Sequence, residues 1–135
     1  MIDPATDQVI AEVADLQVED VRPAIVAAQA AQKEWAAWTA KQRSDKMRAL
    51  FQRLLHHQRD LAYLMTVEQG KPFAESMGEI AYGASYMEWY AEEAKRIYGE
   101  MIPSPASDRR VLVLKQPVGV AAMVSPFFLL SHSFR

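Results

Sequence analysis

Few side chains in this sequence could carry out chemistry, and their spacing does not build a catalytic or metal site. His56 and His57 are adjacent, whereas two histidines that bind one metal ion from a helix usually stand at i and i+4. Neighbouring positions on a helix point in different directions, so structural or solvent-exposed histidines are the favoured interpretation. His132 has no carboxylate close to it in the sequence. The sequence contains no Cys, which excludes a thiolate nucleophile and thiolate metal ligands within it.

Two further groups fall on one predicted helix. Glu88, Glu92 and Glu93 are followed by Lys95 and Arg96, a spacing typical of a solvated helix face. An aromatic group on the same segment could form a ligand platform, although packing in a core or an interface is favoured; its members are Tyr82, Tyr86, Trp89 and Tyr90. The glycines form neither a G-x-G-x-x-G nor a Walker pattern, so no phosphate-binding loop is predicted.

The bulk composition is that of a globular protein, with 50% hydrophobic and 24% charged residues. The formal net charge of −2 offers no electrostatic attraction for nucleic acid. The start of the chain lacks the pattern of a signal peptide. Residues 118–130, the longest apolar stretch, are too few to span a bilayer and include Gly119 and Pro126. We therefore expect a cytoplasmic protein that binds neither nucleic acid nor membrane.

Apolar periodicity predicts three long helices. The first begins after Asp20 as its N-cap, has Pro23 in its first turn, and carries a stripe from Val21 to Trp38. The second opens after Thr39, bends near His57 and stops at Gly70 and Pro72. Its stripe is the most regular of the three and is expected to be the best-buried helix face; it comprises Met47, Leu50, Phe51, Leu54 and Leu55. The third helix runs from about residue 73 to residue 98, with Gly99 at its end, and carries a stripe of Met77, Ile80, Ala84, Met87, Ala91, Ala94 and Tyr98.

Three other segments read as strands. Residues 2–16 alternate weakly, which suggests a short turn followed by a strand. Residues 111–114 and the fully apolar residues 118–124 suggest two late strands, the second of the kind buried on both faces. A parallel α/β domain needs several strands with helices on both faces. The fold class is therefore the α-rich part of an α/β fold, three long helices followed by two strands, and the domain is incomplete.

Several sequence runs, in their order and spacing, resemble the aldehyde dehydrogenase superfamily. They are Asp3-Pro4-Ala5-Thr6, Glu68-Gln69-Gly70-Lys71-Pro72, Glu75-Ser76-Met77-Gly78-Glu79-Ile80, Tyr98-Gly99-Glu100-Met101-Ile102-Pro103 and Lys115-Gln116-Pro117-Val118-Gly119-Val120. The run from Met87 to Gly99 is similar to the succinate-semialdehyde dehydrogenase branch. The resemblance covers residues 3–126 and identifies an N-terminal fragment of such an enzyme.

The resemblance implies NAD- or NADP-dependent oxidation of an aldehyde to a carboxylic acid. In the family a cysteine thiolate attacks the aldehyde, hydride passes to the nicotinamide, and a glutamate activates water to hydrolyse the thioester. It also implies a division of the chain: residues 1–109 as the helical part of the nucleotide-binding domain, 110–117 as the strand leading to the oligomerisation region, and 118–126 as the first strand of the nucleotide-binding core. Residues 127–135 form a divergent tail.

The departures from the family pattern decide what this chain is expected to do. The family's Pro-Trp-Asn-Phe-Pro motif corresponds to residues 126–130, where Phe128 replaces the asparagine that donates to the oxyanion. The cofactor-contacting positions left are Ser125, Pro126, Phe127 and Phe128. No catalytic residue is predicted, and we expect neither catalysis nor firm binding of a dinucleotide. The sudden loss of agreement after Pro126 suggests a disrupted or frame-shifted gene.

A second interpretation comes from a different class of function. The chain would be a non-catalytic helical interaction module that docks on a homologue or another partner. An apolar strand with open edges invites pairing, so association with itself or with a full-length homologue is also expected.

Overall fold

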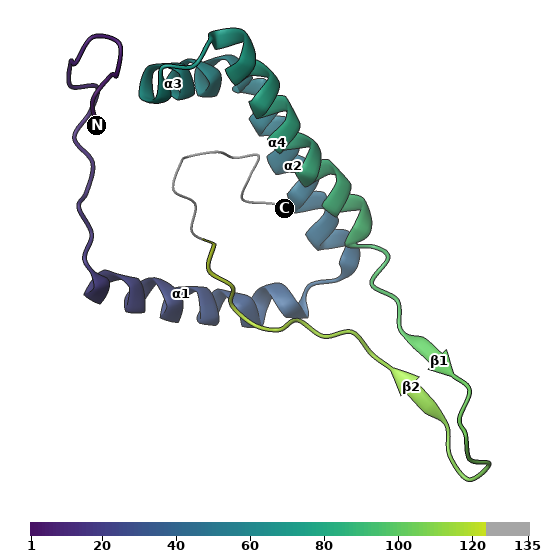
Figure 1. The fold of residues 1–135 in the computed structure, drawn as a ribbon. Coiled ribbons are helices and arrows are strands. Elements are labelled where there is room, and N and C mark those ends of the chain that lie inside the picture. Colours follow the sequence, from purple (N-terminus) through teal and green to yellow (C-terminus); the bar gives the residue numbers. More distant parts are fainter. Residues whose placement is uncertain (124–135) are drawn as a thin grey trace.

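Four helices followed by a two-stranded antiparallel hairpin make up the architecture of residues 1–123 (Figure 1). The computed structural model describes residues 1–123. The elements are α1 (Val18–Ala37), α2 (Ala40–His56), α3 (Gln58–Gln69), α4 (Phe73–Glu93), β1 (Glu100–Ile102) and β2 (Val111–Val113). The α-rich character is confirmed.

Helix boundaries follow the local chemistry of the sequence. Thr39 caps α2: its Oγ1 accepts from the Gln42 amide, while the Gln42 Oε1 accepts from the Thr39 amide at 2.8 Å. This reciprocal arrangement satisfies two amides that lack intrahelical partners. Gly70 ends α3 in the left-handed conformation, with φ of 71°, and Pro72 precedes the first turn of α4.

The predicted second helix is two helices, divided at His57. Its backbone angles, φ −99° and ψ 15°, leave the helical region and end α2. The bend expected near this residue is therefore a complete break. α2 and α4 lie side by side along their lengths, while α3 packs across the N-terminal half of α4 (Figure 1).

The core lies on α4 rather than on α2. Met65 of α3 and Ile80 of α4 are the largest fully buried apolar side chains among the described residues, and the other buried apolar residues are Ala62, Ala84, Met87 and Ala91. The predicted stripe of the third helix is confirmed from Ile80 to Ala91. The prediction that the α2 stripe is best buried is wrong, since Leu50 and Leu55 are 46% and 39% exposed. The reason is placement: α4 is covered by both α2 and α3, whereas α2 packs mainly against α4.

α1 confirms the first predicted helix, although its N-cap is Gln17 and Asp20 lies inside its first turn, and it has no buried residue. Its far end carries Trp35 and Trp38, whose ring centroids are 5.2 Å apart. Figure 1 shows it standing away from the α2–α4 pair. The apolar stripe predicted from its sequence is therefore left largely uncovered by the other elements of residues 1–123.

The end of α4 differs from the sequence-based prediction. The helix stops at Glu93, five residues before Tyr98, and the chain then enters β1. β1 pairs with β2 in the register Glu100↔Val113 and Ile102↔Val111. A Cβ on Gly99 would lie 2.5 Å from the Val113 carbonyl oxygen, so this glycine permits close strand approach rather than ending a helix.

The predicted strands have mixed outcomes. The strand at 111–114 is confirmed as β2. In residues 2–16 only an isolated bridge, Ile2↔Val9, forms. Residues 118–123 hold no strand, and the remainder of the predicted strand at 118–124 lies outside the described residues.

Candidate functional site

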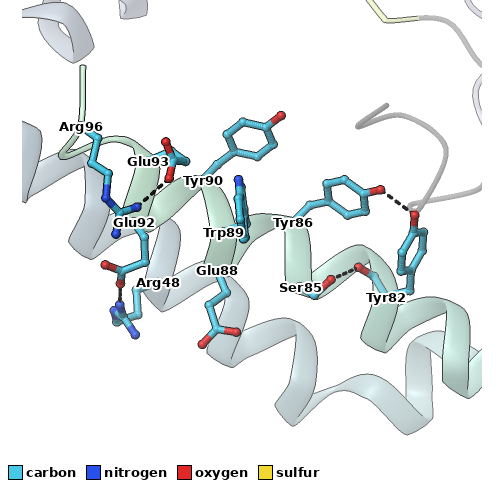
Figure 2. A pocket seen from close by; sticks show the side chains of 10 residues that line it. All are labelled: Arg48, Tyr82, Ser85, Tyr86, Glu88, Trp89, Tyr90, Glu92, Glu93 and Arg96. Atoms are coloured by element: carbon cyan, nitrogen blue, oxygen red, sulfur yellow. Dashed lines mark hydrogen bonds and ion pairs between the residues drawn. The ribbon is translucent and has the colours of Figure 1, made fainter. Parts of the chain in front are cut away.

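A groove of about 880 Å³ runs along the outer side of α4 (Figure 2). α4 supplies most of its lining, α2 contributes one arginine, and the lining ends just beyond α4. The lining residues are Arg48, Tyr82, Ser85, Tyr86, Glu88, Trp89, Tyr90, Glu92, Glu93 and Arg96. Both groups of side chains that the sequence marked on this helix, the carboxylates and the aromatics, therefore share one surface.

Three of the four aromatic side chains of this groove are exposed, and Tyr86 is half-buried. Tyr82 and Tyr86 form an edge-to-face pair with ring centroids 5.1 Å apart, and their hydroxyls are joined by a hydrogen bond of 2.6 Å (Figure 2). Trp89 is 66% exposed and Tyr90 is 47% exposed. Core packing is thus wrong for these residues within the described chain, because the core lies on the opposite side of α4. A ligand platform or an interface remains as their predicted role.

Ion pairs occupy the charged part of the groove. Arg48 of α2 bridges to Glu92 of α4, and Arg96 pairs with Glu93 at 2.6 Å (Figure 2). Lys95 approaches Glu92 at 3.0 Å. The charged helix face predicted from the spacing is confirmed in part, because Glu88, Glu92 and Glu93 lie on α4 whereas Lys95 and Arg96 lie beyond its end at Glu93. The Arg48 partner of Glu92 comes from another helix, which no i, i+4 rule could show. Exposed pairs of this kind contribute little stability.

Two of the sequence runs that carry the family resemblance meet at the end of α3. A Cβ on Gly70 would lie 3.1 Å from Cγ of Pro4, so the N-terminal turn packs against this glycine. The following residue, Lys71, forms an ion pair with Glu79, whose side chain is only 11% exposed. Ser76 is fully buried, and its hydroxyl lies 2.9 Å from the Thr66 hydroxyl. These polar residues join α3 and the residues after it to α4 rather than forming a reactive centre.

The two adjacent histidines are solvent-exposed, which is one of the two interpretations that their spacing favoured. His56 and His57 pack edge to face with ring centroids 4.7 Å apart, and both are exposed. The Nδ1 of His57 is 3.7 Å from an Asp60 carboxylate oxygen. No group of three potential metal ligands occurs within residues 1–123. His132 lies outside the described residues.

The predicted cofactor-contacting residues are not placed by the structure. Ser125, Pro126, Phe127 and Phe128 all lie outside the described residues, so their role stays a prediction. Within residues 1–123, Val118 is fully exposed and Met123 is 66% exposed. None of the helices in the described part of the chain is long and apolar enough to cross a membrane.

The arrangement defines a class of protein. A helical hairpin with a crossing third helix, joined to a β-ribbon, carries the runs that resemble the family but no reactive cluster among residues 1–123. The aldehyde dehydrogenase family profile matches residues 1–129. The chain belongs to the aldehyde dehydrogenase family.

The relatives that the chain resembles are much longer than the chain itself. The chain is 53% identical over 124 residues to glutarate-semialdehyde dehydrogenase of Pseudomonas putida, covering 92% of this chain and 26% of that protein. It is 48% identical to the NADP-dependent succinate-semialdehyde dehydrogenase GabD of Escherichia coli, over 92% of this chain and 26% of the enzyme. The chain thus spans about a quarter of the length of these relatives.

A solved structure gives the same result for the fold. The chain superposes on succinate-semialdehyde dehydrogenase from Burkholderia pseudomallei with a TM-score of 0.84 and 44% identity, covering 87% of this chain and 24% of that one. The fold described above is therefore an N-terminal part of the aldehyde dehydrogenase fold.

Proposed function

We propose that this chain is the N-terminal part of an NAD- or NADP-dependent dehydrogenase that oxidises the semialdehyde of a short dicarboxylic acid. The observation that supports this most is the identity of about one half to semialdehyde dehydrogenases over nearly the whole chain. Relatives of this kind carry the names of glutarate- and of succinate-semialdehyde enzymes. Both aldehydes end in a carboxylate, so the proposed substrate class is an anionic ω-oxo acid in the cytoplasm.

The proposed contribution of this chain is structural. The boundaries proposed from the resemblance assign residues 1–109 to the helical part of the nucleotide-binding domain and residues 110–117 to the lead into the oligomerisation region. Residues 118–126 would form the first core strand, and residues 127–135 a divergent tail. The thiolate that the family chemistry needs has no source here, because the sequence has no Cys.

The chain by itself is therefore proposed to be inactive. Losing one oxyanion donor typically costs about 10²–10³ in rate, and here the nucleophile is missing as well. The test is cofactor reduction by the purified chain with succinate or glutarate semialdehyde and either NAD⁺ or NADP⁺, with P. putida glutarate-semialdehyde dehydrogenase as positive control. Turnover that copurifies with the chain through several columns would contradict the proposal.

The alternative is a non-catalytic interaction module. The exposed apolar residues of α1 and of the β-ribbon favour it: Val21 is 54% exposed, Met101 72% and Leu112 65%. Sedimentation analysis separates it from the simple fragment, since a module should form a discrete complex with itself or a homologue rather than aggregate.

A further inference from the structure

The N-terminal turn, residues 1–10, is a small closed unit that is held together by its own backbone. The Asp3 amide donates to the Gln8 carbonyl, and the Asp7 amide donates to the Asp3 carbonyl, both at 2.9 Å. Ile2 and Val9 close the turn through their isolated bridge. Residues 11–17, which follow, belong to no helix or strand. The N-terminal turn can therefore move as a unit without disturbing α1.

The N-terminal turn rests on Gly70, at the point where α3 ends. A Cβ on Gly70 would lie 3.1 Å from Cγ and 3.9 Å from Cβ of Pro4, so the proline ring lies over the glycine. The apolar side chains of the turn add little to this contact, because Ile2 is 57% and Val9 69% exposed. Burial of apolar surface is the main stabilising term for a packed segment, and little is buried here. The position of the N-terminal turn therefore depends closely on the shape of the chain at Gly70.

The shape of the chain at Gly70 is fixed from α4. Gly70 has a φ of 71°, and the next residue, Lys71, places its ammonium group on the carboxylate of Glu79 in the second turn of α4. The Lys71 and Glu79 side chains are 24% and 11% exposed, so neither charge has much access to water. Removing one partner of such a pair leaves an uncompensated charge, which costs far more than breaking an exposed pair. The pair therefore holds the direction of the chain directly after Gly70.

We propose that the Lys71–Glu79 ion pair is a latch for the N-terminal turn. With the pair formed, the left-handed turn at Gly70 offers no side chain to hinder Pro4, and the N-terminal turn is docked. With the pair broken, Lys71 moves toward solvent, the chain at Gly70 changes direction, and the N-terminal turn detaches as a strap.

The helices keep their packing when the latch opens. Met65 of α3 and Ile80 of α4 belong to one buried cluster that contains neither Lys71 nor Glu79. The hydroxyls of Thr66 and Ser76, 2.9 Å apart, still join α3 to α4. The latch thus couples the corner between α3 and α4 to the N-terminal turn alone, and it makes no use of the proposed dehydrogenase function.

The test measures a distance across the latch in the 135-residue chain. Because the sequence has no Cys, Ala5→Cys in the N-terminal turn and Gln52→Cys in α2 give two unique spin-labelling sites, both at exposed positions. Pulsed electron paramagnetic resonance should give a narrow distance distribution for the docked turn. Glu79→Gln should raise the detached share at least about tenfold, since Lys71 is left without its partner. Glu75→Gln, the same change at an exposed position of α4, is the matched control and should leave the distribution narrow.

Each outcome decides the proposal. The charge-swapped variant, Lys71→Glu with Glu79→Lys, rebuilds the pair and should restore the narrow distribution. A broad distribution in the labelled chain without further changes would overturn the proposal, as would a narrow one in Glu79→Gln or an unrestored one in the swapped variant with parental far-UV circular dichroism. Lys71→Gln breaks the same pair from the loop and gives the answer if Glu79→Gln loses its helical signal. Loss of that signal in both single variants would show that the pair supports the whole fold, which also contradicts a latch.

Discussion

α1 and α4 are helices of nearly equal length, 20 and 21 residues, with apolar stripes of similar period, yet they have opposite surroundings. α4 buries Ile80, Met87 and Ala91 against α2 and α3, while α1 buries nothing. Periodicity alone therefore says that a helix has an apolar face but does not say whether the covering partner belongs to the same segment. The contrast divides the molecule into a self-supporting part, α2 to α4, and a dependent part, α1 with the β-ribbon.

The largest expected effect compares the same substitution in the two helices. Ile80→Ala in α4 removes a side chain that is 1% exposed and should cost about 2–5 kcal/mol of unfolding free energy. Ile25→Ala in α1 removes one that is 42% exposed and should stay within about 0.5 kcal/mol. Urea unfolding followed by far-UV circular dichroism measures both. Equal losses of unfolding free energy in the two variants would contradict the division of the molecule into these two parts.

Substitutions of two glycines, Gly70 and Gly78, test how the N-terminal turn packs at the end of α3. Gly70 has φ of 71° and faces Pro4, so Gly70→Ala should cost about 1–2 kcal/mol. Gly78, inside α4, has open space around its Cα, so Gly78→Ala should stabilise by about 0.5–1 kcal/mol. Opposite shifts of the unfolding midpoint are expected. A stabilised Gly70→Ala variant would show that the N-terminal turn does not pack there.

The smallest expected effect concerns the ion pair between α2 and α4. Arg48→Met removes the bridge to Glu92, whose side chain is 36% exposed, and should cost less than about 1 kcal/mol. The cost should fall further in high salt because salt screens exposed charges. Lys41→Met, which removes the more exposed pair with Asp45, is the control. A larger loss for Arg48→Met that falls steeply with added salt would mean that charge contributes more than packing to joining the two helices.

The elements themselves were largely predictable, but their burial was not. Thr39, Gly70 and Pro72 mark helix ends through local chemistry, and the structure uses all three. The α2 stripe looked best because it is the most regular, yet regularity does not report how many neighbours cover a face. Gly99 looked like a helix terminus because the approach of Val113, fourteen residues later, leaves no local signal. The sequence shows the carboxylate group and the aromatic group of the groove. It does not show the ion pair of Arg48 with Glu92, which depends on the packing of α2 on α4.

The most direct test of the central proposal, that this chain is the N-terminal part of a semialdehyde dehydrogenase, is activity of a chimera. Residues 1–123 would replace the matching segment of the P. putida glutarate-semialdehyde dehydrogenase, and reduction of NAD⁺ or NADP⁺ by glutarate and succinate semialdehydes would be measured beside the chain alone. The account predicts turnover by the chimera and none by the chain. A folded chimera without activity, or turnover by the chain alone, would contradict it.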